Sequence, residues 1–183
     1  MKKIVLFFAA AFVLNASFAQ KAEKTVEVGG APMYPSKNIV ENAVNSKDHT
    51  TLVAAVKAAG LVETLQSAGP FTVFAPVNDA FDKLPKGTVE TLLKPENKST
   101  LIKILTYHVV AGKIDSKELA KKIKEGNGTA ELTTVAGGKL WAMMKGGKVV
   151  LKDEKGGMAY VTIKDVYQSN GVIHVIDSVV LPQ

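Results

Sequence analysis

The hydrophobic period of this chain changes at Gly128. Before Gly128, apolar residues recur at helical spacing, as Leu52, Val56 and Ala59 do. The segments expected to be helical are 38–45, 51–59, 61–67, 79–84, 88–93, 98–106 and 115–124. After Gly128, apolar and polar residues alternate in the segments 129–135, 139–144, 148–151, 159–166 and 172–181, which are separated by Gly-Gly or Asn-Gly pairs. Helices followed by strands predict an α+β fold with a mostly antiparallel sheet.

Two short strands are also expected among the helices. Phe71–Ala75 contains β-forming residues and predicts a strand buried on both faces, which Pro76 ends. We expect Asn78 to cap the helix 79–84, and Tyr107–Val110 to form the second strand.

The pair Asn170-Gly171 is expected to form a hairpin turn with positive φ. A β-branched residue resists this conformation, so Gly171→Val should cost ~1–2 kcal/mol of stability, and Asn170→Ala should also damage folding first.

The N-terminus has the pattern of a secretory signal peptide over residues 1–19. Lys2 and Lys3 precede the apolar run 4–14, which is too short to cross a bilayer as a helix. We expect residues 20–36 to be a flexible N-terminal segment and residues 37–183 to be the folded domain. The processed protein would then be periplasmic or secreted.

The composition excludes several classes of function. The chain has no cysteine, which rules out thiol chemistry and zinc–thiolate sites. Its net charge is +6, yet every basic residue is lysine, and nucleic-acid sites depend on the arginine guanidinium group. Lys121, Lys122 and Lys124 are interpreted as a solvated helix face. A nucleic-acid partner is therefore not expected, whereas an acidic polysaccharide or anionic surface is compatible with this charge.

Two blocks and a central Tyr-His pair resemble the pattern of the fasciclin domain family. The first block is Phe71, Thr72, Val73, Phe74, Ala75, Pro76, Val77, Asn78, Asp79, Ala80, Phe81, and the second is Asn170, Gly171, Val172, Ile173, His174, Val175, Ile176, Asp177. Val77 departs from the family, which has threonine there. The resemblance extends over residues 38–182. It implies a sandwich or wedge of β-sheet with helices packed along one side, in a secreted adhesion and binding domain.

The resemblance also points to candidate adhesion residues. One is the pair Tyr107-His108, for which local packing is the alternative. The other is the segment Ile163–Tyr167, which aligns with a short motif implicated in integrin-mediated adhesion in animal members. Lys164 and Asp165 match that motif and Val166 is a close substitute, whereas Ile163 and Tyr167 depart from it. The alternative is that Asp165 starts a turn and Val166 fills the core.

The residues contain no constellation typical of an enzyme. His49, His108 and His174 have no nucleophile–base pattern around them, and Asp79 and Asp82 are explained by a helix terminus and by solvent exposure. We therefore expect no catalytic, metal or cofactor site.

Two functions remain open: an exported adhesion module that contacts a cell surface, a matrix protein or a polysaccharide, and a small-ligand binder with an apolar pocket between sheet and helices. Trp141 is a further candidate binding residue if it faces outward from its strand. The alternative is that it packs in the core.

Overall fold

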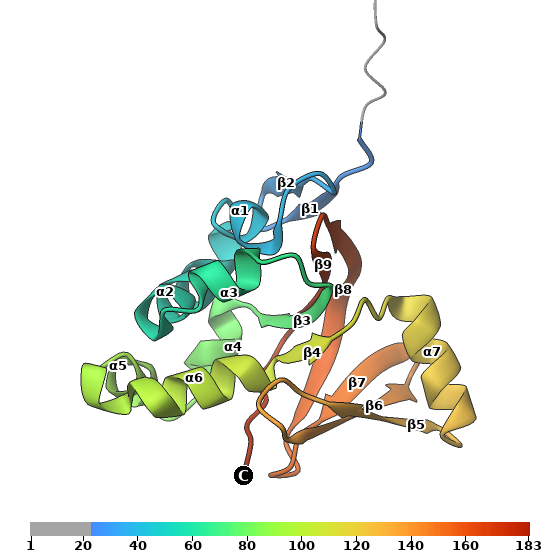
Figure 1. The fold of residues 1–183 in the computed structure, drawn as a ribbon. Coiled ribbons are helices and arrows are strands. Elements are labelled where there is room, and N and C mark those ends of the chain that lie inside the picture. The colour runs from blue at the N-terminus through green and yellow to red at the C-terminus, as the bar shows by residue number, and fades with distance from the viewer. Residues whose placement is uncertain (1–22) are drawn as a thin grey trace, which may run out of the picture.

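The computed structural model describes residues 23–183 (Figure 1). Its main sheet has seven strands in the order β4-β3-β9-β8-β7-β6-β5. The strands are β3 (Phe71–Pro76), β4 (Val109–Ala111), β5 (Thr129–Thr133), β6 (Lys139–Lys145), β7 (Lys148–Lys152), β8 (Met158–Gln168) and β9 (Gly171–Ile176). Only β3 and β9 are parallel; the other neighbouring strands are antiparallel.

The helices named below all precede β5 in the chain. They are α1 (Ile39–Ala43), α2 (Thr50–Ala59), α3 (Val62–Gln66), α4 (Asn78–Asp82), α5 (Thr88–Leu92), α6 (Lys98–Tyr107) and α7 (Ser116–Glu125), with 3₁₀ turns at Lys47–His49 and Pro95–Asn97. The predicted α+β class and the mostly antiparallel sheet are confirmed.

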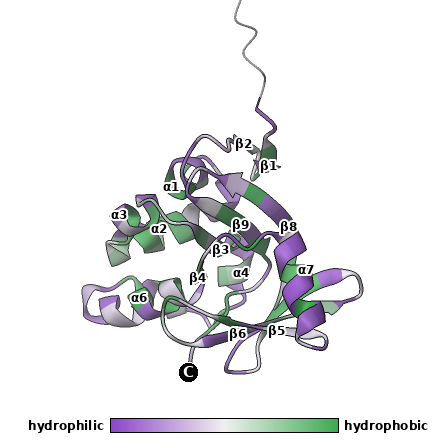
Figure 2. Ribbon diagram, turned by 45° about the vertical axis from the view of Figure 1, so that its right-hand side comes forward, coloured by the Kyte–Doolittle hydropathy of each residue, from purple (hydrophilic) through white to green (hydrophobic). Residues whose placement is uncertain are grey.

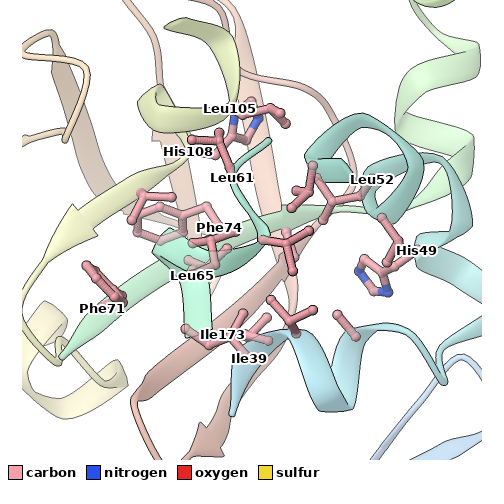
Figure 3. A pocket seen from close by; sticks show the side chains of 18 of the residues that line it. Ile39, His49, Leu52, Leu61, Leu65, Phe71, Phe74, Leu105, His108 and Ile173 are labelled. Carbon is pink, nitrogen blue, oxygen red and sulfur yellow. The ribbon is translucent and has the colours of Figure 1, made fainter. Parts of the chain in front are cut away.

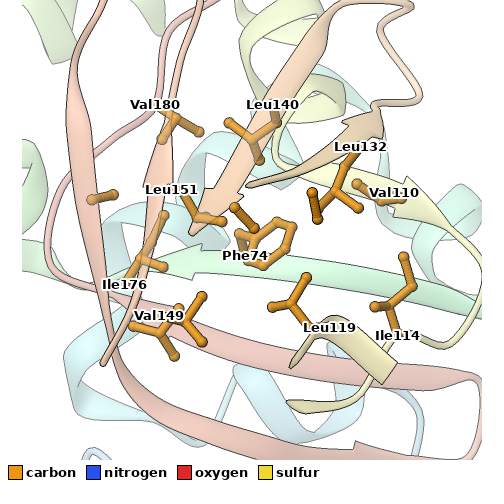
Figure 4. Close-up of a cluster of buried hydrophobic side chains, with 14 of the residues drawn as sticks. Phe74, Val110, Ile114, Leu119, Leu132, Leu140, Val149, Leu151, Ile176 and Val180 are labelled. Atoms are coloured by element: carbon orange, nitrogen blue, oxygen red, sulfur yellow. The ribbon is translucent and has the colours of Figure 1, made fainter. Parts of the chain in front are cut away.

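The main sheet curls until its two outer strands meet. Val110 of β4 forms a bridge with Thr134 just after β5, and the Val135 N–H donates to the Val109 carbonyl at 2.7 Å. The nearly closed sheet encloses one hydrophobic core around Phe74 (Figure 4). Leu119 of α7 is buried in this core, while hydrophilic residues cover the outer side of the helix (Figure 2).

A second core lies on the opposite side of β3 and β9, beneath the N-terminal helices. Val73 and Ala75 of β3 face it, because alternate residues of a strand point to opposite faces. Val56 of α2, Leu65 of α3 and Leu105 of α6 cover it. The sheet thus separates two cores. The N-terminal helices lie along one side, as the resemblance implies, whereas α7 packs on the other core.

The expectation of a flexible segment over residues 20–36 is wrong for residues 26–33. These residues form a hairpin in which β1 (Val26–Val28) pairs with β2 (Ala31–Met33). Val28 and Met33 are buried in the helix-covered core. The strands are too short to show a clear period, although the Gly29-Gly30 turn, with φ of 58° and 73°, is a hairpin signal. The predicted signal peptide, residues 1–19, lies outside the described residues.

Two local predictions are also corrected. Tyr107 is the last residue of α6 rather than a strand residue, and β4 begins at Val109. Asn78 does not cap its own helix. Its Oδ1 accepts a hydrogen bond from the Thr51 N–H at 3.1 Å, so it satisfies a free donor in the first turn of α2.

The sequence predicts a turn at Asn170-Gly171, and the structure has this turn one residue earlier in the chain. The loop between β8 and β9 is Ser169-Asn170, because Gln168 already pairs with Gly171. Neither Asn170 nor Gly171 has a positive φ. Gly171 instead meets a close neighbour: a Cβ there would lie 2.1 Å from the Phe71 carbonyl oxygen.

Candidate functional site

Tyr107 and His108 are buried and fully engaged in local contacts. The Tyr107 hydroxyl donates to the Lys139 carbonyl at 2.5 Å and accepts from the Glu154 N–H at 3.2 Å. His108 Nδ1 pairs with the Ile104 carbonyl at 2.8 Å, and Nε2 accepts from the Val180 N–H at 3.3 Å. This pattern requires the neutral imidazole with hydrogen on Nδ1. The geometry places both side chains inside the domain, where they join α6 to the sheet and to the C-terminal segment.

Burial changes the acid–base properties of these residues. It raises the pKa of Tyr107 to about 12 and lowers the pKa of His108 to about 4. It also lowers the pKa of His174, whose Nε2 donates to the Ile114 carbonyl at 2.8 Å while Nδ1 accepts from the Asp165 N–H. Because both ring nitrogens of His108 and of His174 bond to backbone groups, neither imidazole is free to act as a base.

We predict that the protein loses stability as the pH falls from 7 to 5. The unfolded state takes up a proton near pH 6.5 at His108, whereas the folded state does so only near pH 4. Proton uptake therefore favours the unfolded state between pH 6.5 and pH 4. At pH 5, His108 alone lowers the free energy of unfolding by about 2 kcal/mol. Urea denaturation at pH 7 and pH 5 measures this change. A His108→Gln variant should show a smaller loss than the wild type; an equal loss in both would contradict the assignment.

Asp165 lies at an irregular point of β8 and contacts the start of α7. Its φ is +59°, a left-handed conformation, and it lies within the register shift between Ile163 and Val166. Its carboxylate accepts from both the N–H, at 2.7 Å, and the hydroxyl of Ser116. Val166 is buried in the helix-covered core, and Lys164 is exposed. The Asp165 carboxylate therefore holds the β8 bulge against the first turn of α7.

An open groove borders this contact. It measures ≈ 660 Å³ and is lined by Ala111, Gly112, Lys113, Ile114, Asp115, Lys117, Glu118, Lys121 and Lys122. Tyr167, exposed at the end of the candidate adhesion segment, donates its hydroxyl to the Asp115 carboxylate at 3.2 Å. The Lys113 ammonium lies 4.9 Å from the centre of the Tyr167 ring. Tyr167 thus connects the end of the segment Ile163–Tyr167 to the groove.

The charge of this groove is positive. Four lysines line it against two acids, and of these acids Glu118 is paired with Lys122 at 3.7 Å. Asp115 caps α7, and its hydrogen bond from the Glu118 N–H is the main cause that lowers its pKa. Lys113 and Lys117 are exposed, and neither forms an ion pair among the described residues. The groove can therefore receive an anionic group between these two ammonium groups.

The sequence does not single out Lys113 or Lys117, and it includes Tyr167 only as the end of the aligned segment, where it departs from the motif. Part of this basic surface could have been found in the sequence, because Lys117 and Lys121 are spaced i, i+4 and lie on the same side of one predicted helix. Their proximity to Tyr167 depends on a contact between segments about fifty residues apart.

Trp141 lies on a different surface. Leu140 and Ala142 are buried in the same core as the apolar side of α7, so Trp141, which alternates with them on β6, faces away from α7. It is half-buried, opposite Glu131 on β5 and Lys152 on β7. Met144, near the end of β6, is half exposed. The structure therefore does not bring Trp141 together with Asp165.

The two signature blocks run side by side as the parallel strands β3 and β9. The Phe74 and His174 rings stack at 5.7 Å between centroids. Asp177 accepts from the Tyr160 N–H at 2.9 Å, and Asn170 bonds to three backbone groups. The side-chain contacts of these signature residues are internal to the domain.

An apolar cavity lies between α2, α3 and strand β3 (Figure 3). It encloses ≈ 90 Å³ and is lined almost entirely by aliphatic and aromatic side chains, among them Ile39, Leu52, Leu61, Phe71 and Ile173. An empty apolar space of this size costs about 2 kcal/mol of stability at ~24 cal/mol per Å³. The sequence predicts such a pocket between sheet and helices only under the alternative function, the binding of a small ligand.

His49 is one of the few polar side chains in the cavity wall. It is buried, and its Nδ1 pairs with the Ser46 hydroxyl at 2.8 Å. Its Nε2 has no hydrogen-bond partner among the described residues. Burial lowers the pKa of His49, an effect that the nearby Ala75 carbonyl and Asp48 partly oppose. The imidazole is therefore held in its neutral form, and its Nε2 has almost no accessible surface.

Residues 23–183 contain no cluster of three potential metal-binding side chains, and none of their helices has the length and apolar character needed to span a bilayer.

The curled sheet with helices on one side defines an α+β domain of the FAS1 fold. A solved FAS1 domain pair from the insect cell adhesion molecule fasciclin I has this fold, with a TM-score of 0.71 at 18% identity over 87% of this chain and 58% of that chain. The model of the fasciclin domain matches residues 47–182. This chain belongs to the fasciclin domain family.

Relatives occur in bacteria and animals. Protein sll1483 from Synechocystis sp. is 52% identical over 163 residues, which cover 89% of this chain and 83% of that protein. Immunogenic protein MPB70 from Mycobacterium bovis is 37% identical, over 76% of this chain and 66% of that protein. The transforming growth factor-beta-induced protein ig-h3 from Sus scrofa is 33% identical over 81% of this chain, but the match spans only 20% of that protein.

Proposed function

We propose that this chain is a non-catalytic, exported adhesion module that contacts a cell surface, a matrix or a polysaccharide. The observation that carries this proposal is the basic groove of Lys113 and Lys117, joined by Tyr167 to the segment that resembles the family's adhesion motif. A structurally similar protein, fasciclin I, is a cell adhesion molecule. Export through cleavage after Ala19 is part of the proposal, and the N-terminal residue of the protein recovered outside the cytoplasm tests it.

The groove is suited to a carboxylated or sulfated polysaccharide. Its two unpaired ammonium groups lie on an open surface, where a long chain can reach both. The interaction is solvent-exposed and should therefore weaken as salt rises. Tyr107 and His108 are not part of this surface, because their polar atoms bond inside the domain. Their proposed role is to support the fold that presents the groove.

A paired set of variants tests the groove. We expect the protein to bind immobilised alginate at low salt, and Lys113→Gln/Lys117→Gln to weaken this binding about tenfold, since each exposed charge contact contributes up to ~1 kcal/mol. The control is Lys148→Gln/Lys152→Gln, which removes the same charge from the exposed ends of β7. Neutral dextran should not bind.

An equal loss of alginate binding in both double variants would show that net charge alone attracts the polysaccharide. Absence of binding to alginate, to other acidic polysaccharides and to cell surfaces would contradict the adhesion proposal.

The apolar cavity supports a second candidate function, the binding of a small ligand. A cavity with a mostly apolar wall is a favourable site for an apolar molecule. This function is independent of the groove, because the cavity lies among α1–α3 and β3, whereas the groove lies along α7.

A further inference from the structure

We propose that the outward side of strands β6, β7 and β8 binds an anionic lipid bilayer, with Trp141 at the lipid–water interface. This side, called the outer sheet face, carries the apolar residues Trp141, Met143, Val150, Met158 and Tyr160. The inference goes beyond the proposed function of the groove, because the groove lies along α7, whereas the outer sheet face points away from α7. It gives a role to Trp141, a candidate residue that the groove does not include.

A compact apolar cluster forms the centre of the outer sheet face. Val149 and Leu151 are buried in the core around Phe74, so Val150 between them points outward. Val150 pairs with Met143 on one side and with Tyr160 on the other. It is fully buried, yet it belongs to neither core. Side chains of the outer sheet face itself must therefore cover it.

Trp141 and Met158 extend this cluster along the strands. Lys152 lies between them, since it pairs with Trp141 of β6 and with Met158 of β8. Met158 is 45% exposed, and Lys152 is also exposed. Helix α7 packs on the other side of β5 and β6 (Figure 1). This part of the face is therefore open to a partner as far as residues 23–183 are concerned.

The charge around the cluster is positive. Lys145 and Lys148 lie opposite each other on β6 and β7, and Lys152 lies further along β7. All three are exposed, and none forms an ion pair among the described residues. Glu131, the only acid in the sequences of β5, β6 and β7, is paired with Lys139 at 2.8 Å. The face therefore repels a second copy of itself and attracts an anionic partner.

The residue types suit a bilayer better than a protein partner. Tryptophan and tyrosine have an apolar body and a polar tip, and both are enriched where lipid meets water. The long stem of lysine can cover apolar surface while its ammonium group reaches the lipid headgroups. Protein interfaces, by contrast, are depleted in lysine and depend on arginine, which this chain lacks.

The fluorescence of Trp141 tests this face directly, because the chain has one tryptophan. The chain from Gln20, which includes every described residue, is titrated with vesicles of phosphatidylcholine and with vesicles of equal parts phosphatidylcholine and phosphatidylglycerol. We expect saturable binding to the anionic vesicles alone. The Trp141 emission should move to shorter wavelength, and lipids brominated near the headgroup should quench it. Sedimentation with the vesicles gives the affinity.

Two double variants of equal charge locate the contact. Lys148→Gln/Lys152→Gln should weaken binding to the anionic vesicles about 25-fold, since each lysine near an anionic surface contributes about fivefold. Lys113→Gln/Lys117→Gln should change it less than about twofold in 0.1 M salt, because charges more than ~10 Å from the bilayer are screened. These two variants thus exchange the roles that they have in the alginate assay.

A second pair of variants tests the apolar contribution. Met158→Gln should weaken binding about fivefold, as expected when part of one methionine side chain enters lipid. The control is Met144→Gln. Met144 is 49% exposed, but it alternates with Met143 along β6 and so points away from the outer sheet face. This control should bind the anionic vesicles like the wild type.

Binding to the anionic vesicles without a change in Trp141 emission would overturn the inference, because another surface would then make the contact. Equal weakening by the two double variants would also overturn it, since net charge alone would explain the binding. Absence of binding at low salt would exclude the bilayer and leave an acidic protein as the occupant of the face. None of these results bears on the alginate assay, so the groove and the outer sheet face can fail separately.

Discussion

Replacing Asn170 by alanine is expected to lower the free energy of unfolding by about 4 kcal/mol. The side chain of Asn170 is buried and bonds to backbone groups from two other parts of the chain. Its Oδ1 accepts from the Ile39 N–H at 3.0 Å, and its Nδ2 donates to the carbonyls of Leu65 and Ser67 at 2.8 and 2.9 Å. Alanine leaves these three groups without partners, at about 1–3 kcal/mol each where they are buried.

Urea denaturation at pH 7 measures this effect. The control is Asn97→Ala, which removes one exposed hydrogen bond to the Thr91 carbonyl and should cost less than about 1 kcal/mol. If the two variants were equally stable, the side chain of Asn170 would not connect α1 and α3 to the loop between β8 and β9.

Gly171→Ala is expected to cost about 3 kcal/mol or more, for a reason unrelated to backbone conformation. The added Cβ would lie 2.1 Å from the Phe71 carbonyl oxygen and 3.1 Å from the Phe71 nitrogen. These are backbone atoms of the parallel partner strand, so β3 and β9 must move apart, in a core that tolerates little overpacking. Valine at this position should be worse than alanine.

The matched control is Gly146→Ala in the turn between β6 and β7. Gly146 has a φ of +58° but no atom within 4 Å of the added Cβ, so it isolates the conformational cost, about 1 kcal/mol. A stability loss of Gly171→Ala no greater than that of Gly146→Ala would show that β3 and β9 accommodate the methyl group. Thermal unfolding of both variants decides this.

The sequence predicts a helix or a strand correctly where the hydrophobic pattern repeats several times within one segment. The period-two alternation of Lys139–Met144 predicts a strand, and the structure has one there, because one face packs on a core and the other does not. The hairpin 26–33 has too few residues for such a pattern. It is ordered because Val28 and Met33 reach the helix-covered core, a contact made only in three dimensions.

The contacts of single polar residues were less predictable. Asn78 was expected to bond to its own helix, as asparagine commonly does, yet it bonds to α2, whose first turn lies nearby in the fold. The candidate Asp165 could be located as a turn residue, but not its contact with Ser116 or the neighbouring lysines of the groove. Such pairings depend on how distant segments approach, and neither propensity nor spacing specifies this.

The meeting of β4 with the end of β5 has a consequence for how such domains associate. An unpaired outer strand can recruit an extended peptide or a second copy of the chain, which is how many sheet proteins assemble or aggregate. In the main sheet the bridge between Val110 and Thr134 and the Val135–Val109 hydrogen bond occupy part of both outer strands. The short β4 therefore offers little room for strand addition. We therefore expect copies of this chain to resist edge-to-edge pairing of their main sheets.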